Sequence, residues 1–233
     1  MCGRFVGYRS KEELLDLFPI DSCETEVVAN YNIAPTQEVL AVVRRDNKNY
    51  LEKFHWGLVP FWAKDISIGA RMINARAETV HTKPSFRNAF KQRRCLILSD
   101  GFYEWTGDEG HKQPYFLTLS EERPFAFAGI WEIWDDQKRL SPGYRSCAII
   151  TTAASDTMRP IHHRMPVILE PEVYQQWLDP KYRDVDGLRE ILNHMTITEL
   201  VSRQVSRQVN AVRNNNSSNI KPMKQMDLNM GGS

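Results

Sequence analysis

The sequence predicts an α+β fold: a single domain with a β-rich, curved or barrel-like, mostly antiparallel core and peripheral helices. Short runs of β-branched and aromatic residues, separated by turn residues, fill the middle of the chain, whereas helix signals cluster toward its two ends. The length of 233 residues is enough for one well-buried core, and a composition of 42% hydrophobic and 25% charged residues is that of an ordinary globular protein. The segment from residue 214 onward is rich in Asn, Ser, Met and Gly. We therefore expect one domain over residues 1–222 and a disordered tail over residues 223–233.

Three segments carry helix signals. Ser10 and Glu13 have the spacing of a capping box, and the apolar residues that follow predict a short helix ending before Pro19. Residues 171–178 have proline in the first turn and apolar residues four apart, which predicts a second helix. Residues 186–192 predict a third.

Strands are expected where short apolar runs are bounded by turn residues, because that length and punctuation favour sheets over helices. The runs are 39–43, 53–56, 95–98, 115–119, 125–130, 147–152 and 167–169.

The cysteine pattern argues against a disulfide framework and against a zinc site, because no two cysteines form a C-x-x-C pair. We expect reduced thiols, no metal and no cofactor. The four cysteines are Cys2, Cys23, Cys95 and Cys147.

Charge and hydropathy limit the partners and the compartment. Lys and Arg total 30 against 29 Asp and Glu, a formal charge of +1, so any contact with nucleic acid must come from a local basic cluster. No apolar run approaches the roughly 20 residues that a membrane helix needs. The first residues lack the order of a secretory signal, and Glu12 and Glu13 argue against a transit peptide. The expectation is a cytoplasmic, monomeric protein with no membrane span.

Cys2 offers reactive chemistry. Once the initiator methionine is removed, residue 2 presents an α-amine and a thiol on adjacent carbons. An aldehyde condenses with the amine to an imine, and the thiolate then adds to the imine carbon and closes a thiazolidine ring. The ordinary pKa values, about 7.7–8.0 for the amine and about 8.5 for the thiol, leave both groups partly deprotonated near neutral pH. Taken alone, the first residues could equally well begin a strand.

Two polar residues in apolar settings could move protons. Glu104 stands between aromatic residues near the end of an expected strand, where desolvation would raise the pKa of its carboxyl. His162 lies in a turn ahead of the run at 167–169, and an imidazole suits proton transfer at neutral pH. The structural alternatives stay open: a glutamate paired with an arginine, and a histidine that only stabilises a turn.

Arginines could supply the local basic cluster. Asn74 and Arg76 alternate with small residues, so both project from one face of an extended segment. There Asn74 could orient a substrate oxygen, and Arg76 could pair with a phosphate. Arg87 adds a guanidinium beside an aromatic residue, and Arg93 and Arg94 could extend the basic surface. A solvated charged face explains each arginine equally well alone.

The segment 56–62 is dense in aromatic residues and too punctuated by Gly and Pro for a helix. Aromatic platforms interleaved with arginines are typical of proteins that stack unpaired bases. Core packing is the competing explanation, and for Trp56 it is the better one.

Several motifs, in order along the chain, together resemble the SOS-response-associated peptidase family of abasic-site processing proteins. The resemblance covers nearly the whole chain, to about residue 222. The motifs are residues 1–5 (Met-Cys-Gly-Arg-Phe), 32–36 (Asn-Ile-Ala-Pro-Thr), 56–60 (Trp-Gly-Leu-Val-Pro), 74–78 (Asn-Ala-Arg-Ala-Glu), 101–105 (Gly-Phe-Tyr-Glu-Trp), 162–166 (His-His-Arg-Met-Pro), 209–210 (Val-Asn) and 212–214 (Val-Arg-Asn).

The resemblance implies a DNA-damage protein that binds single-stranded DNA containing abasic sites. It implies a covalent thiazolidine crosslink between Cys2 and the aldehyde of the ring-opened sugar. The same site would contain Asn74 to hold the sugar or the terminus, Glu104 to transfer protons during ring closure, and His162 to release the aldehyde from the closed sugar. The residues that the resemblance implies as DNA contacts are Arg4, Pro35, Trp62, Arg76, Arg87 and Trp105.

Two functions of other classes stay open. One is an N-terminal-cysteine peptidase in which the free amine acts as the base. The other is a single-strand binding module that protects DNA without a covalent bond. Strand cleavage by β-elimination and autocatalytic removal of Met1 are further reactions that this chemistry allows.

Overall fold

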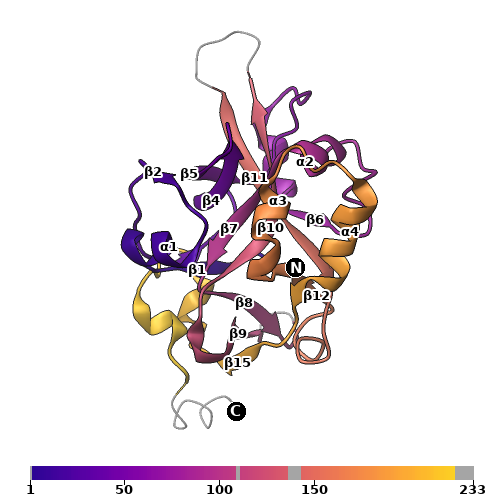
Figure 1. Ribbon diagram of the computed structural model, residues 1–233. Coiled ribbons are helices and arrows are strands. Elements are labelled where there is room, and N and C mark those ends of the chain that lie inside the picture. The colour runs from indigo at the N-terminus through magenta and orange to yellow at the C-terminus, as the bar shows by residue number, and fades with distance from the viewer. Residues whose placement is uncertain (1, 109–110, 136–142, 224–233) are drawn as a thin grey trace.

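The structure is a computed structural model that describes residues 2–108, 111–135 and 143–223 (Figure 1). Its elements form one domain with a large, mostly antiparallel β core and a few helices, which confirms the α+β prediction. Residues 224–233, nearly all of the predicted tail, lie outside the described residues.

The core is a barrel, because a ring of paired strands returns to its starting point. β4 (Glu38–Arg45) pairs with β5 (Lys48–Trp56) and with β7 (Arg94–Ser99). β7 pairs with β10 (Phe125–Trp134), and β10 pairs with β11 (Tyr144–Ala153). β11 then pairs with β5, the one parallel link of the ring. The barrel-like core predicted from the short apolar runs is therefore confirmed, and each of those runs overlaps a strand.

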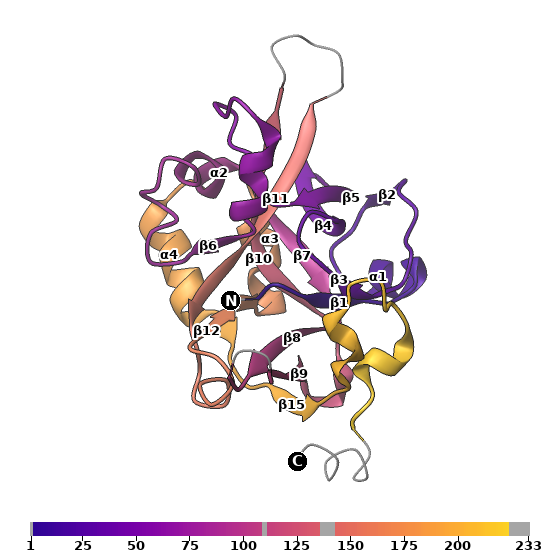
Figure 2. The same cartoon turned by 180° about the vertical axis from the view of Figure 1, so that it is seen from behind.

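A second sheet lies below the barrel in both views (Figures 1 and 2). Its strand order is β15 (Val201–Gln204), β9 (Gln113–Thr118), β8 (Gly101–Thr106), β1 (Phe5–Gly7) and β3 (Asn30–Ile33), and all neighbours are antiparallel. The N-terminal strand is thus an inner strand of this sheet.

Short strands extend the barrel. β6 (Asn74–Arg76) and β12 (Arg164–Pro166) both pair with β11, and β13 (Ile168–Leu169) pairs with β10 and with β14 (Thr196–Ile197). β2 (Ser22–Cys23) pairs with β5. Since β6 and β12 meet on β11 near residue 151, the segments around Asn74 and His162 lie at the same place on the barrel.

The helices cover the barrel from outside. They are α1 (Lys11–Leu17), α2 (Arg87–Gln92), α3 (Tyr174–Leu178) and α4 (Val185–His194). The capping box is present: Glu13 N donates to Ser10 Oγ over 3.2 Å, and Ser10 N donates to the Glu13 carboxylate over 2.8 Å. Short 3-10 helices occur at Ile66–Arg71, Ser120–Glu122, Pro171–Val173, Arg207–Asn210 and Ser217–Ile220. Within the described residues, no helix is long and apolar enough to cross a membrane.

Alternate residues of the barrel strands face two different hydrophobic clusters, as the two-residue period of a strand requires. Val39, Ala41 and Val43 point into the barrel with Phe127 and Ile149. Val42, Leu96 and Ala128 on the barrel strands point outward instead, into a cluster with Phe90, Trp177 and Leu188 of the helices. Because both faces are buried, these strands read as continuous apolar runs.

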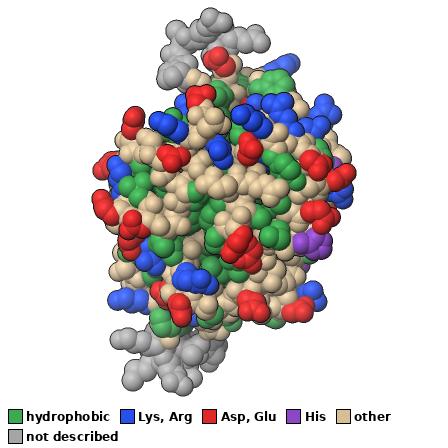
Figure 3. Space-filling model, in the orientation of Figure 1, with side chains coloured by type: hydrophobic (Ala, Val, Ile, Leu, Met, Phe, Trp, Pro, Cys, Tyr) green, Lys and Arg blue, Asp and Glu red, His purple; other side chains and the backbone are tan. Residues whose placement is uncertain are grey.

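Arg94 does not extend a basic surface, so that expectation is wrong. Its side chain is only 2% exposed, and its guanidinium donates to main-chain carbonyls between α2, α3 and the segment after α3. Burial lowers its pKa to about 10. The acceptors are the carbonyl oxygens of Trp177, Phe90, Lys91, Asp179 and Tyr182. Elsewhere, basic and acidic side chains are interspersed on the face in Figure 3, in keeping with the net charge of +1.

We predict that Arg94→Met lowers the free energy of unfolding by about 3 kcal/mol or more, because several buried carbonyls lose a charged donor. Equilibrium urea unfolding measures this. Arg213→Met, at an exposed position, is the control and is expected to change stability by no more than about 0.5 kcal/mol. Equal stability of the two variants would contradict a structural role for the Arg94 guanidinium.

Candidate active site

The first residues of the chain run into the interior of the molecule. Cys2 is fully buried and belongs to the cluster inside the barrel. β1 pairs with β8 through Phe5 and Phe102, and Tyr103 N donates to Arg4 O over 2.9 Å. Continued antiparallel pairing would bring Gly3 opposite Glu104, and the Glu104 carboxylate is close enough to Cys2 for its charge to act on the thiol.

Asn74 holds the backbone at Cys2. Its Nδ2 donates to the Cys2 carbonyl oxygen over 2.8 Å. Its Oδ1 is buried and has no hydrogen-bond partner among the residues that the structure describes. One end of the amide therefore fixes residue 2, and the other end is an acceptor for a group that binds there.

Glu104 is a buried carboxyl next to the thiol. Its side chain is only 4% exposed, and burial raises its pKa above the ordinary value. Burial also raises the pKa of the Cys2 thiol, and the negative charge of Glu104 raises it further. A carboxyl with a raised pKa can accept and return protons closer to neutral pH, and the protonated thiol needs such an acceptor before it can react.

The main chain of Arg164 holds the His162 ring through Nδ1. Arg164 N lies 2.9 Å from this nitrogen and can donate to it, and Arg164 O lies 3.1 Å from it and can accept from it, so either neutral tautomer has a partner. Burial lowers the pKa of His162, and the charges of Arg164 and Lys112 lower it further, so the ring is neutral at pH 7. The exposed His163 stacks on it with ring centroids 4.3 Å apart.

An open pocket of about 490 Å³ joins these groups to the surface. Glu104 and His162 line it, whereas the buried Cys2 is not part of its wall. In both views the N-terminal segment lies beside β12, the strand that follows His162 (Figures 1 and 2). The complete lining is Arg4, Glu104, Trp105, Lys112, His162 and Asn210.

Two of the expected DNA contacts, Arg4 and Trp105, form the wall of this pocket. The Arg4 guanidinium lies over the Trp105 ring, 5.7 Å from its centroid, and Nη1 donates to Asn32 Oδ1 and to Val209 O. Trp105 Nε1 donates to Asn210 Oδ1 over 2.7 Å. Both side chains are therefore held in place before any ligand binds.

The other expected DNA contacts lie outside the pocket lining. Arg76 ends β6 and Arg87 begins α2, and both are exposed. Trp62 is 47% exposed in the segment after β5, whereas Pro35 is half-buried in a turn. Trp56 is fully buried and donates from Nε1 to Ile73 O, which confirms its core role.

Sequence reasoning missed two pocket residues. Lys112 lies between β8 and β9, and a single lysine there belongs to no motif from which a place in the pocket could be predicted. Asn210 belongs to one of the motifs, but only the structure shows that it faces Trp105. In the described part of the chain, no group of three or more His, Cys, Asp and Glu side chains could hold a metal ion.

Comparison with known proteins gives consistent matches over most of the chain. The family model of the SOS response associated peptidase (SRAP) matches residues 1–212. The abasic site processing protein YoqW of Bacillus subtilis (strain 168) is 43% identical over 218 residues, which are 92% of this chain and 96% of YoqW. The abasic site processing protein YedK of Escherichia coli (strain K12) is 31% identical over 183 residues, which are 76% of this chain and 79% of YedK.

The fold has also been seen before. A crystal structure of a protein from Bacteroides thetaiotaomicron superimposes with a TM-score of 0.85 and covers 96% of this chain and 100% of that one. The sequence identity is 22%, so the likeness is one of fold.

The buried carboxyl generates a prediction about stability. The folded-state pKa of Glu104 is raised above the ordinary 4.5, so folding favours its protonated form. This group therefore contributes most to the free energy of unfolding below about pH 4.5, and its contribution decreases as the pH rises through the raised pKa. Glutamine does not titrate, so the melting temperature of Glu104→Gln minus that of the wild type should increase over this pH range.

Thermal unfolding in a series of buffers from pH 4 to pH 8 measures this difference. Glu12→Gln removes an exposed carboxylate and controls for the change in net charge. A difference that stays flat or decreases with pH would show that burial does not dominate at Glu104.

Proposed function

The chain belongs to the SOS response associated peptidase (SRAP) family, and from this premise we propose that it processes abasic sites in single-stranded DNA. In the proposed reaction, Cys2 captures the aldehyde of the ring-opened sugar as a covalent thiazolidine. Two relatives with similarity over most of the chain are named abasic site processing proteins, which supports the substrate. The product would shield the lesion during the DNA-damage response.

The observation that carries the proposal is the environment of residue 2. Its carbonyl is bound by Asn74, its thiol is within electrostatic reach of the buried carboxyl of Glu104, and a pocket lined by Glu104 and His162 is open to the surface. Because Asn74 holds the carbonyl of residue 2, it restricts where the amine and the thiol of the same residue can lie. Orienting the reacting groups in advance lowers the entropic part of the activation barrier.

The first step is the release of the aldehyde. The abasic sugar is mostly a closed hemiacetal, so a proton must reach the ring oxygen while the anomeric hydroxyl loses one. We propose that the neutral ring of His162 accepts the proton of the anomeric hydroxyl and, as the imidazolium, donates it to the ring oxygen.

The second step forms the ring. After removal of Met1, the amine of Cys2 adds to the aldehyde carbon, and loss of one water gives the imine. Glu104 takes the thiol proton and the sulfur then adds to the imine carbon, after which Glu104 returns the proton to the ring nitrogen. The raised pKa of the thiol favours this order, since the thiol reacts only when the carboxylate can accept its proton.

The DNA strand would be held by side chains on both sides of the pocket. Arg4 would pair with a phosphate at the pocket itself, and Arg76 and Arg87 would pair with phosphates outside it. Trp105, Trp62 and Pro35 would stack on bases or separate them.

Two side reactions follow from the same chemistry. An imine at C1′ acidifies the C2′ proton, so β-elimination would cleave the strand and make the protein a lyase. The Cys2 thiol could also attack the preceding peptide carbonyl and move the Met1 acyl group from nitrogen to sulfur. Water would then hydrolyse the thioester, which would be an autoproteolytic removal of Met1.

We predict that Cys2→Ala forms no adduct with a single-stranded oligonucleotide carrying one abasic site. We predict that Glu104→Gln still forms the adduct, but about 10²- to 10⁴-fold more slowly, because an aminothiol retains its intrinsic reactivity without a general base. Denaturing gel electrophoresis after a time course measures both.

Cys23→Ala is the matched control, since Cys23 is a half-buried thiol on β2 outside the site. Undiminished adduct from Cys2→Ala would reject the assignment of Cys2. Adduct formation only with peptide substrates would favour the peptidase, and unmodified protein that still binds DNA would favour the non-covalent module.

For the DNA contacts, we predict that Arg76→Ala weakens binding of a single strand and lowers the slope of log K against log salt by about 0.7 for the lost phosphate contact. The measurement is a fluorescence anisotropy titration at several salt concentrations, in the Cys2→Ala background so that only non-covalent binding is seen. Lys48→Ala, at the exposed β4–β5 turn, is the charge-matched control. An equal loss in both variants would contradict a specific contact.

A further inference from the structure

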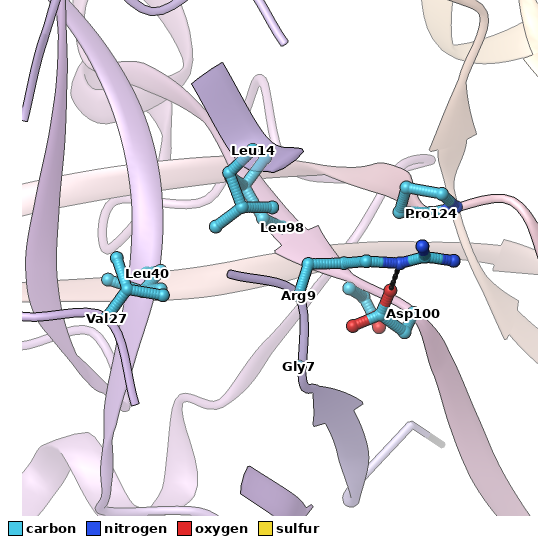
Figure 4. A pocket seen from close by; sticks show the side chains of 9 residues that line it. Gly7, Arg9, Leu14, Val27, Leu40, Leu98, Asp100 and Pro124 are labelled. Atoms are coloured by element: carbon cyan, nitrogen blue, oxygen red, sulfur yellow. Dashed lines mark hydrogen bonds and ion pairs between the residues drawn. The ribbon is translucent and has the colours of Figure 1, made fainter. Parts of the chain in front are cut away.

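Asp100 is a buried carboxylate outside the proposed active site. It lies between β7 and β8, four residues before Glu104, and its side chain is only 2% exposed. Each of its carboxylate oxygens accepts one hydrogen bond from the N-terminal segment. Tyr8 N donates to Oδ2 over 2.7 Å. Arg9 Nε donates to Oδ1 over 3.0 Å (Figure 4).

The surroundings strengthen this contact. The Arg9 guanidinium is directed by two further acceptors, the Glu13 carboxylate at 2.9 Å and Glu122 O at 3.0 Å. Leu14, Val27 and Leu40 line the cavity beside the pair, which lowers the local dielectric constant (Figure 4). That cavity has a volume of about 20 Å³, room for about one water molecule, so it cannot accept a small-molecule ligand.

Despite the guanidinium, burial keeps the pKa of Asp100 above its ordinary value. The titratable and charged groups around the carboxylate are Arg9, Tyr8, Glu13 and Glu122. Holding an ionised carboxylate here therefore lowers stability relative to an exposed one, and stability alone does not explain its presence.

What the contact does is hold the end of a short strand. β1 is Phe5–Gly7, and only Phe5 and Val6 pair with β8. Its pairing with β3 is also short and is interrupted by an irregularity between Phe5 and Gly7. Asp100 N donates to Val6 O over 2.8 Å, so the same residue binds β1 through its main chain as well as through its carboxylate.

The register of β1 against β8 decides where residue 2 lies relative to Glu104. A slip by one residue would move the segment that leads from Cys2 by about 3.3 Å along β8. Asn74 holds the segment at Cys2, and Asp100 holds it at Tyr8 and Arg9. Asp100 also directly precedes β8, the strand that carries Glu104.

We propose that Asp100 is a positioning residue for the reaction of Cys2: by binding Tyr8 N and Arg9 Nε, it fixes the register between the strand that leads from Cys2 and the strand that carries Glu104. This inference rests on the proposed function. Asp100 itself touches neither the thiol nor the DNA, and it acts through β1.

The test separates position from binding and from overall stability. Asp100→Asn keeps the size of the side chain but leaves one acceptor oxygen for two donors. The saturating rate constant of covalent capture should fall by about tenfold to a hundredfold, and the DNA concentration for half-saturation should change less than about twofold. Hydrogen exchange of the amides of residues 3–8 should accelerate, with the barrel strands unchanged.

Glu132→Gln is the matched control, because Glu132 is another buried carboxylate, 4% exposed and paired with Arg93 at 2.7 Å, but on β10. It should keep the wild-type rate. Arg9→Gln removes the other half of the anchor and serves if Asp100→Asn does not fold.

Three results would overturn the proposal: unchanged exchange at residues 3–8, faster exchange with an unchanged rate constant, or an equal rate loss in Glu132→Gln. A wild-type protein that forms no adduct at all would instead reject the proposed function, and the exchange measurement would still report on the anchor.

Discussion

The pairing of β1 with β8 is the constraint on which the candidate site depends. A strand of three residues carries the start of the chain into the molecule, and it buries residue 2 completely beside a carboxyl whose pKa burial raises. At the protein surface, the thiol of a cysteine and the carboxyl of a glutamate would have ordinary pKa values. In a region of low dielectric constant the pKa of the thiol and that of the carboxyl are both raised, which is the basis of the proton transfer that we propose between them.

The barrel explains how distant segments reach this strand. β11 pairs with β6 and β12, so it brings the residues around Asn74 and His162 to one side of the N-terminal segment. β8 approaches from the other side with Glu104 and Trp105. The segment after β15 then closes the pocket, because Asn32 binds the carbonyls of Val209, Ala211 and Asn214. Asn74 and Glu104 lie on strands and His162 lies two residues before one, which limits the movement of these side chains.

The sequence predicted the parts of the fold whose signal is local. The capping box at Ser10 and the apolar runs of the barrel gave correct elements, because capping and burial on both faces leave a pattern in adjacent residues. It did not predict α2, whose N-cap Phe86 makes no side-chain cap, or β1, which is held by its neighbours rather than by propensity. The burial of Arg94 was not predicted because three of its acceptors, the carbonyls of Trp177, Asp179 and Tyr182, lie more than 80 residues away.

For the site, residue types and motifs predicted which side chains matter, and only the structure showed how they meet. No periodicity reveals that Asn74 binds the Cys2 carbonyl, 72 residues away, or that Lys112 and Asn210 share a pocket with Glu104. The most direct test is the mass of the peptide 2–4 after incubation with abasic DNA, without borohydride. A ring-closed adduct predicts a peptide that starts at Cys2, has gained the DNA sugar with loss of one water, and has neither a free amine nor a free thiol. An unmodified peptide 2–4, or one that still carries Met1, would contradict it.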